Sequence, residues 1–509
     1  MDANGVSRRD FVARSAALAA GVLIVPRHVL GGQSFVAPSD KLRIAIVGAG
    51  GMGQNNWMRL LDEDVVAVCD ADLPYVERGI LGRLRPRQDG SVAPEAVRLK
   101  ASWDKAAKYV DFRELLARER DLDAVVIATP DHLHATIAVA AMRAGKHVYV
   151  QKPLCWSVEE ARLLTKVWQE TGVVAEMGNQ GHSMEGTRRI KDWISAGVIG
   201  PVREVHVWTD RPQRYWAQGL PWPGQDRNRP PAPPPGPNTP PPTWNVRQVE
   251  RALLRQMEDQ VAPPPAGLRW DLWLGPVAQD LAYHPAFHPF TWRGWVPFGV
   301  GAIGDMGAHL LDQPMFALDL GLPETIVASS TAWGGPAASP ASYPHAMTVQ
   351  FGFGARDRKP PVTLSWYDGG LIPPRPRFLP DDAPFPSADG GGGFIVGERG
   401  MISYGTYGDG ARLWPESLRT PGDRVPKTTA RIDVPHEIAW VRACKKQAPP
   451  SAPFDYSARL TEVMLLGLVA SRAGSGTLLR YDAPAMQVVN VPAANAFLTR
   501  PYRAGWELR

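Results

Sequence analysis

Cysteine is scarce in this 509-residue sequence, which contains only Cys69, Cys155 and Cys444. No two of them stand in a Cys-x-x-Cys spacing, so the chain has neither the framework of a disulfide-stapled domain nor a thiolate zinc site. An HExxH motif is also missing, because His436-Glu437 has no second histidine after it. We therefore expect a fold held together by a hydrophobic core, without a metal ion.

Long runs of one charge are missing as well. The formal net charge is +5, and residues 1–38 hold four arginines and two aspartates, a net +2 of that total. No Lys/Arg run follows, so the sequence argues against a nucleic-acid-binding surface. Hydrophobic residues make up 44% and charged residues 21%, as in ordinary globular proteins, and the length suffices for two domains.

The N-terminal segment has the pattern of an export signal. Ser7-Arg8-Arg9-Asp10-Phe11-Val12 is a twin-arginine motif, and the weakly apolar run 15–25 follows it. That run is shorter than the ~20 residues of a membrane-spanning helix, so no stable membrane span is expected. An amphipathic helix that carries two arginines is the alternative. We expect residues 1–38 to be a leader read by the twin-arginine (Tat) export machinery, which places the protein in the periplasm or outside the cell.

A phosphate-binding loop follows the first predicted strand. The run 41–47 is rich in β-branched residues and leads into Gly48-Ala49-Gly50-Gly51-Met52-Gly53, and the helix-compatible stretch 54–61 comes next. A strand before and a helix after are the context in which GxGxxG binds a dinucleotide. The glycines let the backbone approach the pyrophosphate, and the helix N-terminus offers free N–H groups to it. The predicted cofactor contacts of this loop are Gly48, Gly50, Gly51, Met52 and Gly53.

Asp70 indicates which dinucleotide is bound. It ends a second predicted strand, 65–69, and stands 22 residues after Gly48. An acid at this position accepts hydrogen bonds from the adenosine ribose and repels a 2′-phosphate, which favours NAD over NADP. A turn or helix-capping role is the alternative for Asp70.

Strands and helices keep alternating up to residue 178. The expected strands are 123–128, 147–150 and 173–176, and the expected helices are 135–144 and 158–171. This alternation predicts an α/β fold whose first domain, residues 41–178, is a Rossmann-type, doubly wound parallel sheet. Ligands bind at the carboxyl ends of such strands, where Thr129-Pro130 and Gln151-Lys152 stand.

Four motifs in this order make the chain resemble the Gfo/Idh/MocA oxidoreductases, the family of glucose–fructose oxidoreductase and inositol dehydrogenase. They are Gly48–Gly53, Ala128-Thr129-Pro130-x-x-x-His134, Gln151-Lys152-Pro153 and Gly304-Asp305-x-Gly307-x-His309-x-x-Asp312. The resemblance covers roughly residues 41–509 and implies a second α/β domain, 179–509, with an open, mostly antiparallel sheet. The alternating runs 347–353, 362–367, 394–396 and 401–404 fit that sheet. The resemblance also implies a homo-oligomer, with the substrate between the sheet and the nicotinamide.

The same resemblance implies which residues carry the chemistry. Lys152 and His309 correspond to the residues that face the reacting alcohol, and Asp305 would bind substrate hydroxyls or orient His309. If a helix begins at residue 305, Asp305 and His309 share one of its faces, and His309 is expected to act as acid and base near neutral pH. Further cofactor contacts are implied for Thr129, Pro130, His134, Gln151 and Lys152, although a packing role is equally open for His134.

Residues typical of carbohydrate sites stand just before the Asp305 motif. Trp273 and Trp292 could stack on a sugar ring and Arg293 could bond its hydroxyls, while core packing is the alternative for the tryptophans. His182, after a predicted strand end, and His284 complete the expected substrate contacts. The prolines around His284 argue against a continuous helix and therefore against a zinc-binding histidine pair.

Two features depart from the family pattern. Gln151 stands where the family usually has glutamate, which removes a possible ion-pair partner of Lys152. The proline-rich stretch 211–265, which contains Pro230-Pro231-Ala232-Pro233-Pro234-Pro235, is interpreted as a surface insertion of extended, polyproline-like chain, and a lid or an oligomer arm is the alternative.

The predicted function is NAD-dependent oxidation or reduction of a hydroxyl group on a sugar or polyol. Because no pool of free NAD exists outside the cytoplasm, we expect an exported enzyme to hold its cofactor tightly and to reset it in each cycle. A redox-neutral, NAD-dependent glycosidase or lyase, which oxidises a sugar hydroxyl transiently, is therefore the alternative. A sugar-binding protein with a vestigial dinucleotide site is a third hypothesis, and the presence of Lys152, Asp305 and His309 argues against it.

Overall fold

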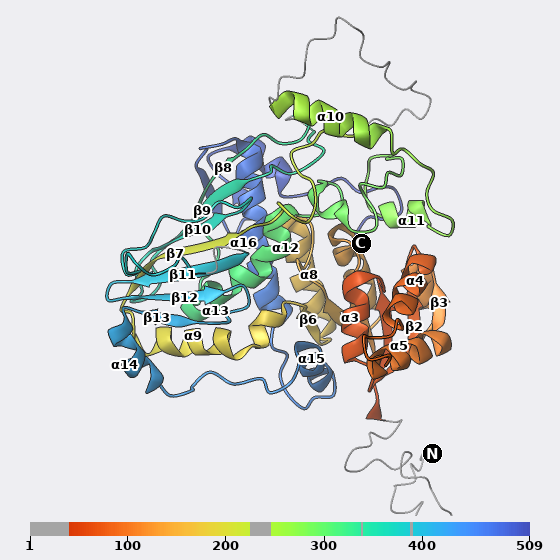
Figure 1. Cartoon of the computed structure of the whole chain (residues 1–509), viewed down its shortest axis with the longest axis horizontal. Coiled ribbons are helices and arrows are strands. Elements are labelled where there is room, and N and C mark those ends of the chain that lie inside the picture. The colour runs from red at the N-terminus through yellow and green to blue at the C-terminus, as the bar shows by residue number, and fades with distance from the viewer. Residues whose placement is uncertain (1–39, 224–245, 337–338, 387–389, 509) are drawn as a thin grey trace, which may run out of the picture. The chain divides into compact units, whose positions relative to one another are not determined.

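The computed structural model describes residues 40–223, 246–336, 339–386 and 390–508, and only the backbone of residues 246–251. The twin-arginine motif, the apolar run after it and the prolines 230–235 lie outside the described residues. Residues 43–509 form one compact unit. The two sheets of this unit are shown in Figure 1.

The first sheet has six parallel strands in the order β3-β2-β1-β4-β5-β6. The strand order reverses between β1 and β4, which confirms the predicted doubly wound arrangement. The strands are β1 (Arg43–Val47), β2 (Asp64–Cys69), β3 (Ala107–Tyr109), β4 (Ala124–Ile127), β5 (His147–Val150) and β6 (Ala175–Met177).

Helices connect these strands. They are α3 (Gly51–Arg59), α4 (Leu73–Arg83), α5 (Pro94–Lys105), α6 (Phe112–Arg118), α7 (Asp131–Arg143) and α8 (Val158–Thr171). The bounds of α8 agree with the prediction because both of its ends carry strong signals: Ser157 and Glu160 form a capping box, and Gly172 ends the helix with a φ of +64°. In contrast, α7 begins at Asp131, before the expected residue 135.

The second sheet has nine strands in the order β13-β12-β11-β7-β10-β9-β8-β14-β15. Among the described strands of this second sheet, only β7 and β10 pair in parallel, so the predicted mostly antiparallel sheet is confirmed. The central strand β7 had not been anticipated from the sequence. The strands are β7 (Val202–Thr209), β8 (Thr325–Ser330), β9 (Met347–Phe353), β10 (Val362–Tyr367), β11 (Gly391–Gly397), β12 (Met401–Gly405), β13 (Arg412–Trp414), β14 (Leu479–Asp482) and β15 (Gln487–Val488).

The helix α16 (Phe454–Ala473) packs between the second sheet and the first domain, since it contacts both α8 and strands β8 and β9 (Figure 1). The helix α12 (Gly301–Leu310) packs on α16 and on strand β7, and α13 (Asp312–Leu318) packs on α12 and on α9 (Glu185–Ser195). One hydrophobic core accordingly contains residues of both domains, such as Ile127 and Leu465. The remaining helices of the second domain are α10 (Val246–Glu258), α11 (Trp270–Leu274), α14 (Arg419–Asp423) and α15 (His436–Cys444).

The helix α10 corrects one expectation. It lies inside the stretch 211–265 that was interpreted as extended chain, yet residues 246–258 are helical. No proline occurs in this segment, whereas leucine, arginine and glutamine, all good helix formers, are frequent. The interpretation as extended chain was therefore wrong for residues 246–258, because the prolines of the stretch 211–265 all lie outside this segment.

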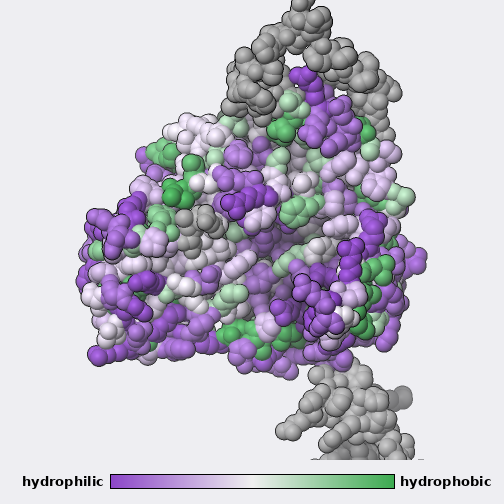
Figure 2. Space-filling model, in the orientation of Figure 1, coloured by the Kyte–Doolittle hydropathy of each residue, from purple (hydrophilic) through white to green (hydrophobic). Residues whose placement is uncertain are grey.

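Within the described residues, none of the helices combines the length and apolar character needed to cross a bilayer. The face seen in Figure 2 is mostly hydrophilic, and its hydrophobic residues lie in small, separate groups. The described part of the chain also contains no cluster of three or more His, Cys, Asp or Glu side chains arranged to hold a metal ion.

Candidate active site

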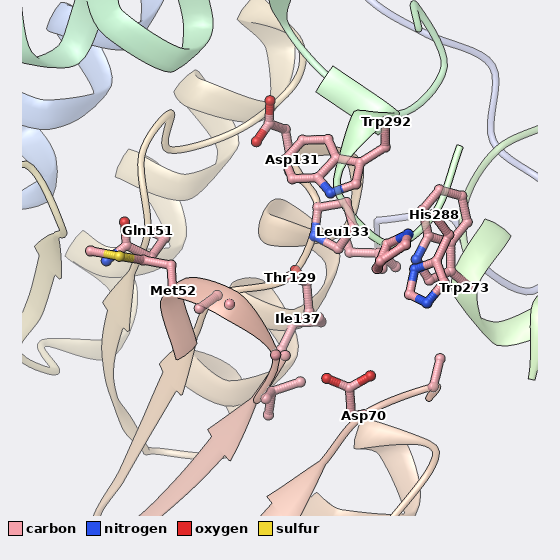
Figure 3. A pocket seen from close by; sticks show the side chains of 18 of the residues that line it. Met52, Asp70, Thr129, Asp131, Leu133, Ile137, Gln151, Trp273, His288 and Trp292 are labelled. Carbon is pink, nitrogen blue, oxygen red and sulfur yellow. The ribbon is translucent and has the colours of Figure 1, made fainter. Parts of the chain in front are cut away.

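A pocket of about 470 Å³ opens at the carboxyl ends of the first sheet (Figure 3). The loops after β1, β2, β4 and β5 contribute to its lining, as expected for a ligand bound where the strand order reverses. Residues of the second domain close the other side, among them Trp273, Trp292, Arg293 and His309. Most of the predicted site residues line this cavity.

The loop after β1 has the conformation that its glycines allow. Gly48 has a φ of +80°, and a Cβ there would lie 2.5 Å from the backbone nitrogen of Thr129. A Cβ at Gly53 would collide with the Gly48 carbonyl oxygen, so α3 can pack this closely on the loop only with glycine at 53. All of the predicted loop residues except Gly53 line the pocket.

Asp70 lies at the end of β2 and lines the same pocket (Figure 3). Its Oδ2 accepts a hydrogen bond from the Ala49 N–H and its Oδ1 accepts one from the Asp72 N–H, each at 2.9 Å. Burial raises the pKa of this carboxyl, and the two N–H donors oppose that rise. The carboxylate is thus fixed beside the glycine loop, where the ribose hydroxyls of a dinucleotide would donate to it.

The residues around the glycine loop fit a dinucleotide. The space beside Gly51 is open, because an added Cβ would meet nothing within 4 Å there. Gly51 is also the first residue of α3. The buried hydroxyl of Thr129 has no hydrogen-bond partner in the described part of the chain. A bound phosphate or amide would supply that missing partner. These features would hold the pyrophosphate at a helix N-terminus.

His134 lies behind the pocket rather than in its lining. Its Nδ1 is 2.7 Å from the Pro153 carbonyl oxygen and its Nε2 is 2.9 Å from the Thr129 carbonyl oxygen. The ring therefore joins the two loops that follow β4 and β5. Both ring nitrogens are thus engaged by the backbone, which is the packing role, and the expected cofactor contact of His134 stays a prediction.

Lys152 belongs to a cluster of charges on the second-domain side of the pocket. Its Nζ donates to Asp305 Oδ1 and to the Asp305 carbonyl oxygen, each at 2.8 Å. Arg293 Nε lies 3.4 Å from Asp305 Oδ1, and Arg211 Nε lies 3.5 Å from Asp305 Oδ2. Burial alone would raise the pKa of Asp305, but the charges of Lys152 and Arg293 hold it well below its usual range. Asp305 is therefore an anion that fixes the position of Lys152.

His309 stands one helical turn after Asp305 on α12 and lines the pocket. The helix begins at Gly301 rather than at 305, and the two residues share a face as predicted. The ring packs edge-on against Tyr407 with 4.8 Å between centroids, and its Nδ1 has no partner among the residues that the structure describes. Burial, followed by the charge of Lys152, lowers the pKa of His309 to about 3. The imidazole is therefore neutral at pH 7, and its expected role as acid and base stays a prediction.

Gln151 lines the pocket but does not pair with its neighbour Lys152. Its Nε2 donates to Asn56 Oδ1 at 3.0 Å, and Asn56 Nδ2 donates to Glu437 Oε1 at 2.9 Å. The carboxylate partner of Lys152 is instead Asp305. The absence of glutamate at position 151 consequently does not leave the lysine without an ion pair.

Trp292 and Arg293 line the pocket, and Figure 3 shows Trp292 next to Asp131 and far from Asp70. The Arg293 guanidinium lies 4.2 Å from the centre of the Trp292 ring. A flat aromatic face with an adjacent cation suits a ring that carries hydroxyl or carboxylate groups. These two predicted substrate residues thus stand near the Lys152 cluster.

Trp273 lines a different part of the pocket. Figure 3 shows it beside His288, and its ring stacks on Trp270 with 4.7 Å between centroids. His288 Nε2 in turn lies 2.9 Å from Asp72 Oδ2, two residues after Asp70. Trp273 accordingly belongs to an aromatic group over the Asp70 end of the pocket, away from the charge cluster.

His182 and His284 do not line the pocket, so their expected substrate contacts are not found. The His182 Nδ1 lies 2.8 Å from Asp312 Oδ1, and its buried ring packs against Phe316. His284 Nε2 lies 2.6 Å from the Met257 carbonyl oxygen at the end of α10. The strand-end position of His182 was misleading because the short 3-10 helix that follows β6 turns its ring into the second domain.

Three residues near the site were missed by the sequence analysis. Asp131 lines the pocket and directly follows Thr129-Pro130 at a strand end, a signal that was available. Arg211 fell inside the stretch interpreted as an insertion. Tyr407 lies in a turn after β12 and contacts His309 across more than 90 residues of sequence, so no local pattern could have placed it there.

Two family models match the sequence. Residues 42–179 match the Gfo/Idh/MocA model described as "Oxidoreductase family, NAD-binding Rossmann fold". Residues 245–328 match its companion, "Oxidoreductase family, C-terminal alpha/beta domain", and this match begins inside the stretch 211–265. The first domain is thus an NAD-binding Rossmann domain, in agreement with the prediction from Asp70.

Curated relatives share part of the chain. It is 32% identical over 168 residues to 4-carboxy-2-hydroxymuconate-6-semialdehyde dehydrogenase of Sphingobium, which covers 33% of this chain and 47% of that relative. It is 28% identical over 170 residues to inositol 2-dehydrogenase of Salmonella typhimurium, covering 32% of this chain and 45% of the relative. It is 26% identical over 219 residues to glycosyl hydrolase family 109 protein 1 of Shewanella, and this match covers 39% of this chain and 44% of the relative. The chain thus spans about half the length of the relatives it matches.

Solved structures share the fold over a longer range. The WlbA dehydrogenase from Bordetella pertussis, solved in complex with NADH and UDP-GlcNAcA, superimposes with a TM-score of 0.51 at 16% identity. The superposition covers 87% of this chain and 99% of that chain. The pairing of a Rossmann domain with a large, mostly antiparallel sheet is therefore an architecture found in solved structures.

Proposed function

We propose that this chain as a whole is a Gfo/Idh/MocA oxidoreductase that uses NAD to oxidise or reduce a hydroxyl group of a sugar or polyol. The matches of both domains to models of this family support the assignment. The substrate class is supported by relatives whose names are inositol 2-dehydrogenase and 1,5-anhydro-D-fructose reductase. The stacked Trp292 and Arg293 side chains fit a polar ring.

The observation that carries this proposal is the position of Lys152, Asp305 and His309. Lys152 and His309 line the same pocket as the glycine loop, and Asp305 is bonded to Lys152. A dinucleotide whose ribose reaches Asp70 would extend along this pocket toward the charge cluster. The polar groups that a reacting alcohol needs would then surround the far end of the cofactor.

The chemistry expected of these side chains follows from their contacts. Bound NAD would supply the acceptor for the hydride that leaves the carbon atom. Lys152, fixed through two of its N–H groups by Asp305, would donate its third to the substrate oxygen and stabilise the negative charge that develops there. The Nδ1 of neutral His309 has no partner among the described residues, so the ring would hydrogen-bond a substrate hydroxyl.

Tight retention of NAD is part of the proposal, and the cover over the Asp70 end supports it. The Arg269 N–H donates to the Ala71 carbonyl oxygen at 2.8 Å, and His288 pairs with Asp72. Trp506, near the C-terminus, also lines this end of the pocket. Segments of the second domain thus fasten to the Rossmann domain beside the adenosine site, where they would slow release of the cofactor.

Export through the twin-arginine pathway to the periplasm remains a proposal from sequence. Its support is the Ser7–Val12 motif and the short apolar run after it. This pathway carries folded proteins, which suits a chain that must keep a bound dinucleotide. Fractionation of cells that express the full chain, with and without an Arg8→Lys/Arg9→Lys change, tests it: only the parent should reach the periplasm.

A homo-oligomer is also proposed. One face of β9 and β10 is buried in the core through Val349 and Leu364, while the other exposes Gln350 and Thr363. An open sheet face of this kind could be covered by a second copy of the chain. Light scattering of the purified protein should give a mass that is a multiple of 55.6 kDa.

A second candidate function is a redox-neutral glycosidase or lyase that oxidises a sugar hydroxyl only transiently. The relatives named glycosyl hydrolase family 109 protein 1 and 2,7-anhydro-N-acetylneuraminate hydratase favour it. Both functions need the same first half-reaction, so the same residues serve either one. They differ in whether NADH accumulates.

Purification of the full chain without added cofactor separates these possibilities. We expect NAD(H) absorbance to co-purify with the protein and a panel of sugars, polyols and aryl glycosides to contain a substrate. Accumulation of NADH with a sugar supports the oxidoreductase, and glycoside cleavage without NADH supports the alternative. A protein that neither carries nor binds NAD would contradict both.

A further inference from the structure

A second cavity, of about 310 Å³, lies where α16 packs beside the start of α8. Its lining is largely apolar and includes Val158 of α8, Leu465, Leu468 and Val469 of α16, and Phe497 near the C-terminus. None of its lining residues belongs to the lining of the pocket at the glycine loop. Small-molecule sites have volumes of roughly 300–1,000 Å³, so this separate cavity is large enough for a small ligand.

Arg472, in the last turn of α16, brings a positive charge to this cavity. Its guanidinium carbon lies 4.4 Å from the centre of the Phe497 ring and 5.4 Å from that of the Trp333 ring. Its buried Nε has no hydrogen-bond partner in the described part of the chain. Burial lowers the pKa of Arg472, yet a guanidinium stays charged at neutral pH. The guanidinium is therefore a cation between two aromatic rings.

The charge of Arg472 is not balanced by the walls of the cavity. None of the described residues that line it is an aspartate or a glutamate. Arg500 is the other cation in the lining, and it has its own anion, because its Nη2 lies 2.6 Å from Glu160 Oε1. The same Nη2 donates to the His132 carbonyl oxygen at 2.7 Å. Within the described lining, the uncompensated positive charge is thus that of Arg472.

Trp333 contributes a second hydrogen-bond donor to the same cavity. Its side chain is part of the lining, and its buried indole N–H has no acceptor among the residues that the structure describes. The ring packs against Tyr343 with 5.5 Å between centroids. Buried donors in native proteins nearly always have a partner, and a buried charge without a counter-ion costs free energy. A bound anion with acceptor oxygens would offset both costs.

We propose that this cavity binds a small carboxylate with an apolar body, and that the carboxylate pairs with Arg472. The apolar walls would cover an aromatic ring or a branched chain, and the guanidinium would bind the carboxylate through two N–H groups. One uncompensated cation suits a monoanion better than a phosphate dianion. This ligand differs in chemistry from the sugar or polyol of the reaction pocket, and the proposal does not rest on the proposed function.

Calorimetric titration with two matched probes tests the role of the charge. The full chain, with NAD in excess, is titrated with 2-naphthoate and with 2-naphthylmethanol, which has the same ring system but no charge. Wild type should bind 2-naphthoate about 10-fold more tightly than the alcohol, because a hydrogen bond between charged groups is lost with the alcohol. Equal affinities for the two probes, or no binding of 2-naphthoate, would overturn the proposal.

Substitutions then locate the bound anion. Arg472→Met keeps a long apolar side chain without the charge, so 2-naphthoate should bind about 10-fold more weakly and lose its advantage over the alcohol. Arg459→Met, at an exposed position of the same helix, is the matched control and should bind both probes as wild type does. If Lys152→Met weakens binding and Arg472→Met does not, the anion lies in the reaction pocket and the proposal is refuted.

A crystal of the wild-type chain soaked with 6-bromo-2-naphthoate decides the question even if Arg472→Met does not fold. The anomalous signal of bromine should lie in the cavity beside Phe497, with the carboxylate within hydrogen-bond distance of Arg472. Bromine found only in the reaction pocket, or a cavity filled by a second copy of the chain, would overturn the proposal. None of these measurements involves turnover, so their outcome is independent of whether the chain oxidises a sugar or polyol.

Discussion

The two ends of the pocket are built in different ways. The nucleotide end is built around one short stretch, Gly48 to Asp70, in which backbone conformation and N–H groups fix the glycine loop and the carboxylate. The reaction end joins side chains from distant segments, including Lys152, Arg293 and Asp305. A continuous stretch can be recognised as a sequence motif, whereas an assembly of charges depends on the packing of two domains.

The pKa of a buried aspartate is shifted in opposite directions at the two ends. Asp70 has two N–H donors, and burial raises its pKa. Asp305 is buried too, yet the adjacent cations Lys152 and Arg293 lower its pKa. The comparison shows that the charge state of a buried acid is decided by the full charges nearby rather than by burial alone.

The largest expected effect is a loss of catalysis with little change in NAD affinity. Lys152→Met removes the ammonium ion at the reaction end, so kcat/KM should fall about 1000-fold because charge on the substrate oxygen is no longer stabilised. The affinity for NAD should change little, since the nucleotide end is untouched. Steady-state kinetics and calorimetric NAD titration measure the two quantities. Lys105→Met, at an exposed position on α5, is the control; equal losses of rate and NAD affinity would break the comparison.

The second effect acts on the nucleotide end. Gly48→Ala places a Cβ against the Thr129 backbone at a φ of +80°, so the loop must shift and NAD affinity should fall about 100-fold. Gly82→Ala has no neighbour within 4 Å and serves as the control. Calorimetry gives the affinities, and circular dichroism checks the fold. Unchanged NAD binding in Gly48→Ala would show that this loop does not hold the cofactor.

The third effect sharpens the account of the reaction end. His309→Gln should lower kcat about 10-fold by loss of a substrate hydrogen bond. The pH dependence of kcat between about pH 5 and about pH 9 should keep its shape, because the pKa of His309 is about 3 and its ring is neutral throughout that range. The pH profile of both proteins, with the exposed His345→Gln as control, measures this. A profile that changes its shape in His309→Gln would mean that the histidine titrates in this range.

The last effect, of similar size, concerns cofactor choice. Asp70→Asn removes the charge that faces the ribose, so NAD affinity should fall about 10-fold while NADP affinity rises. The ratio of the two dissociation constants is the quantity to measure. The exposed Asp64→Asn, at the start of β2, should leave the ratio unchanged. An unaltered ratio in Asp70→Asn would place the adenosine ribose elsewhere.

Sequence alone predicted the fold class and the nucleotide end because both depend on local patterns. The alternating apolar runs gave the order of strands and helices, and Gly48, Gly53 and Asp70 occupy fixed positions after two strands. Lys152 and His309 were found only through the family resemblance. Arg211, which contacts Asp305, and Tyr407, which contacts His309, were not found, because they reach the site through tertiary packing.

Three histidines that the sequence analysis predicted at the site do not line the pocket. His134, His182 and His284 are polar residues near strand ends or prolines, but the structure satisfies their rings with backbone or carboxylate groups outside the pocket. Asp131 was overlooked because α7 was expected to begin at 135, although the helix starts directly after Pro130. A buried acid that lacks a full counter-ion contact is visible only once its surroundings are known.

Rapid mixing of the NAD-loaded chain with the polyol and sugar panel, followed by nicotinamide absorbance, tests the central claim most directly. For at least one compound, wild type should show a rise in NADH absorbance within a single turnover. Lys152→Met, with NAD still bound, should show none on the same time scale. Absence of any rise in wild type, or an equally fast rise in Lys152→Met, would contradict the claim that this pocket carries out hydride transfer at the Lys152–Asp305 cluster.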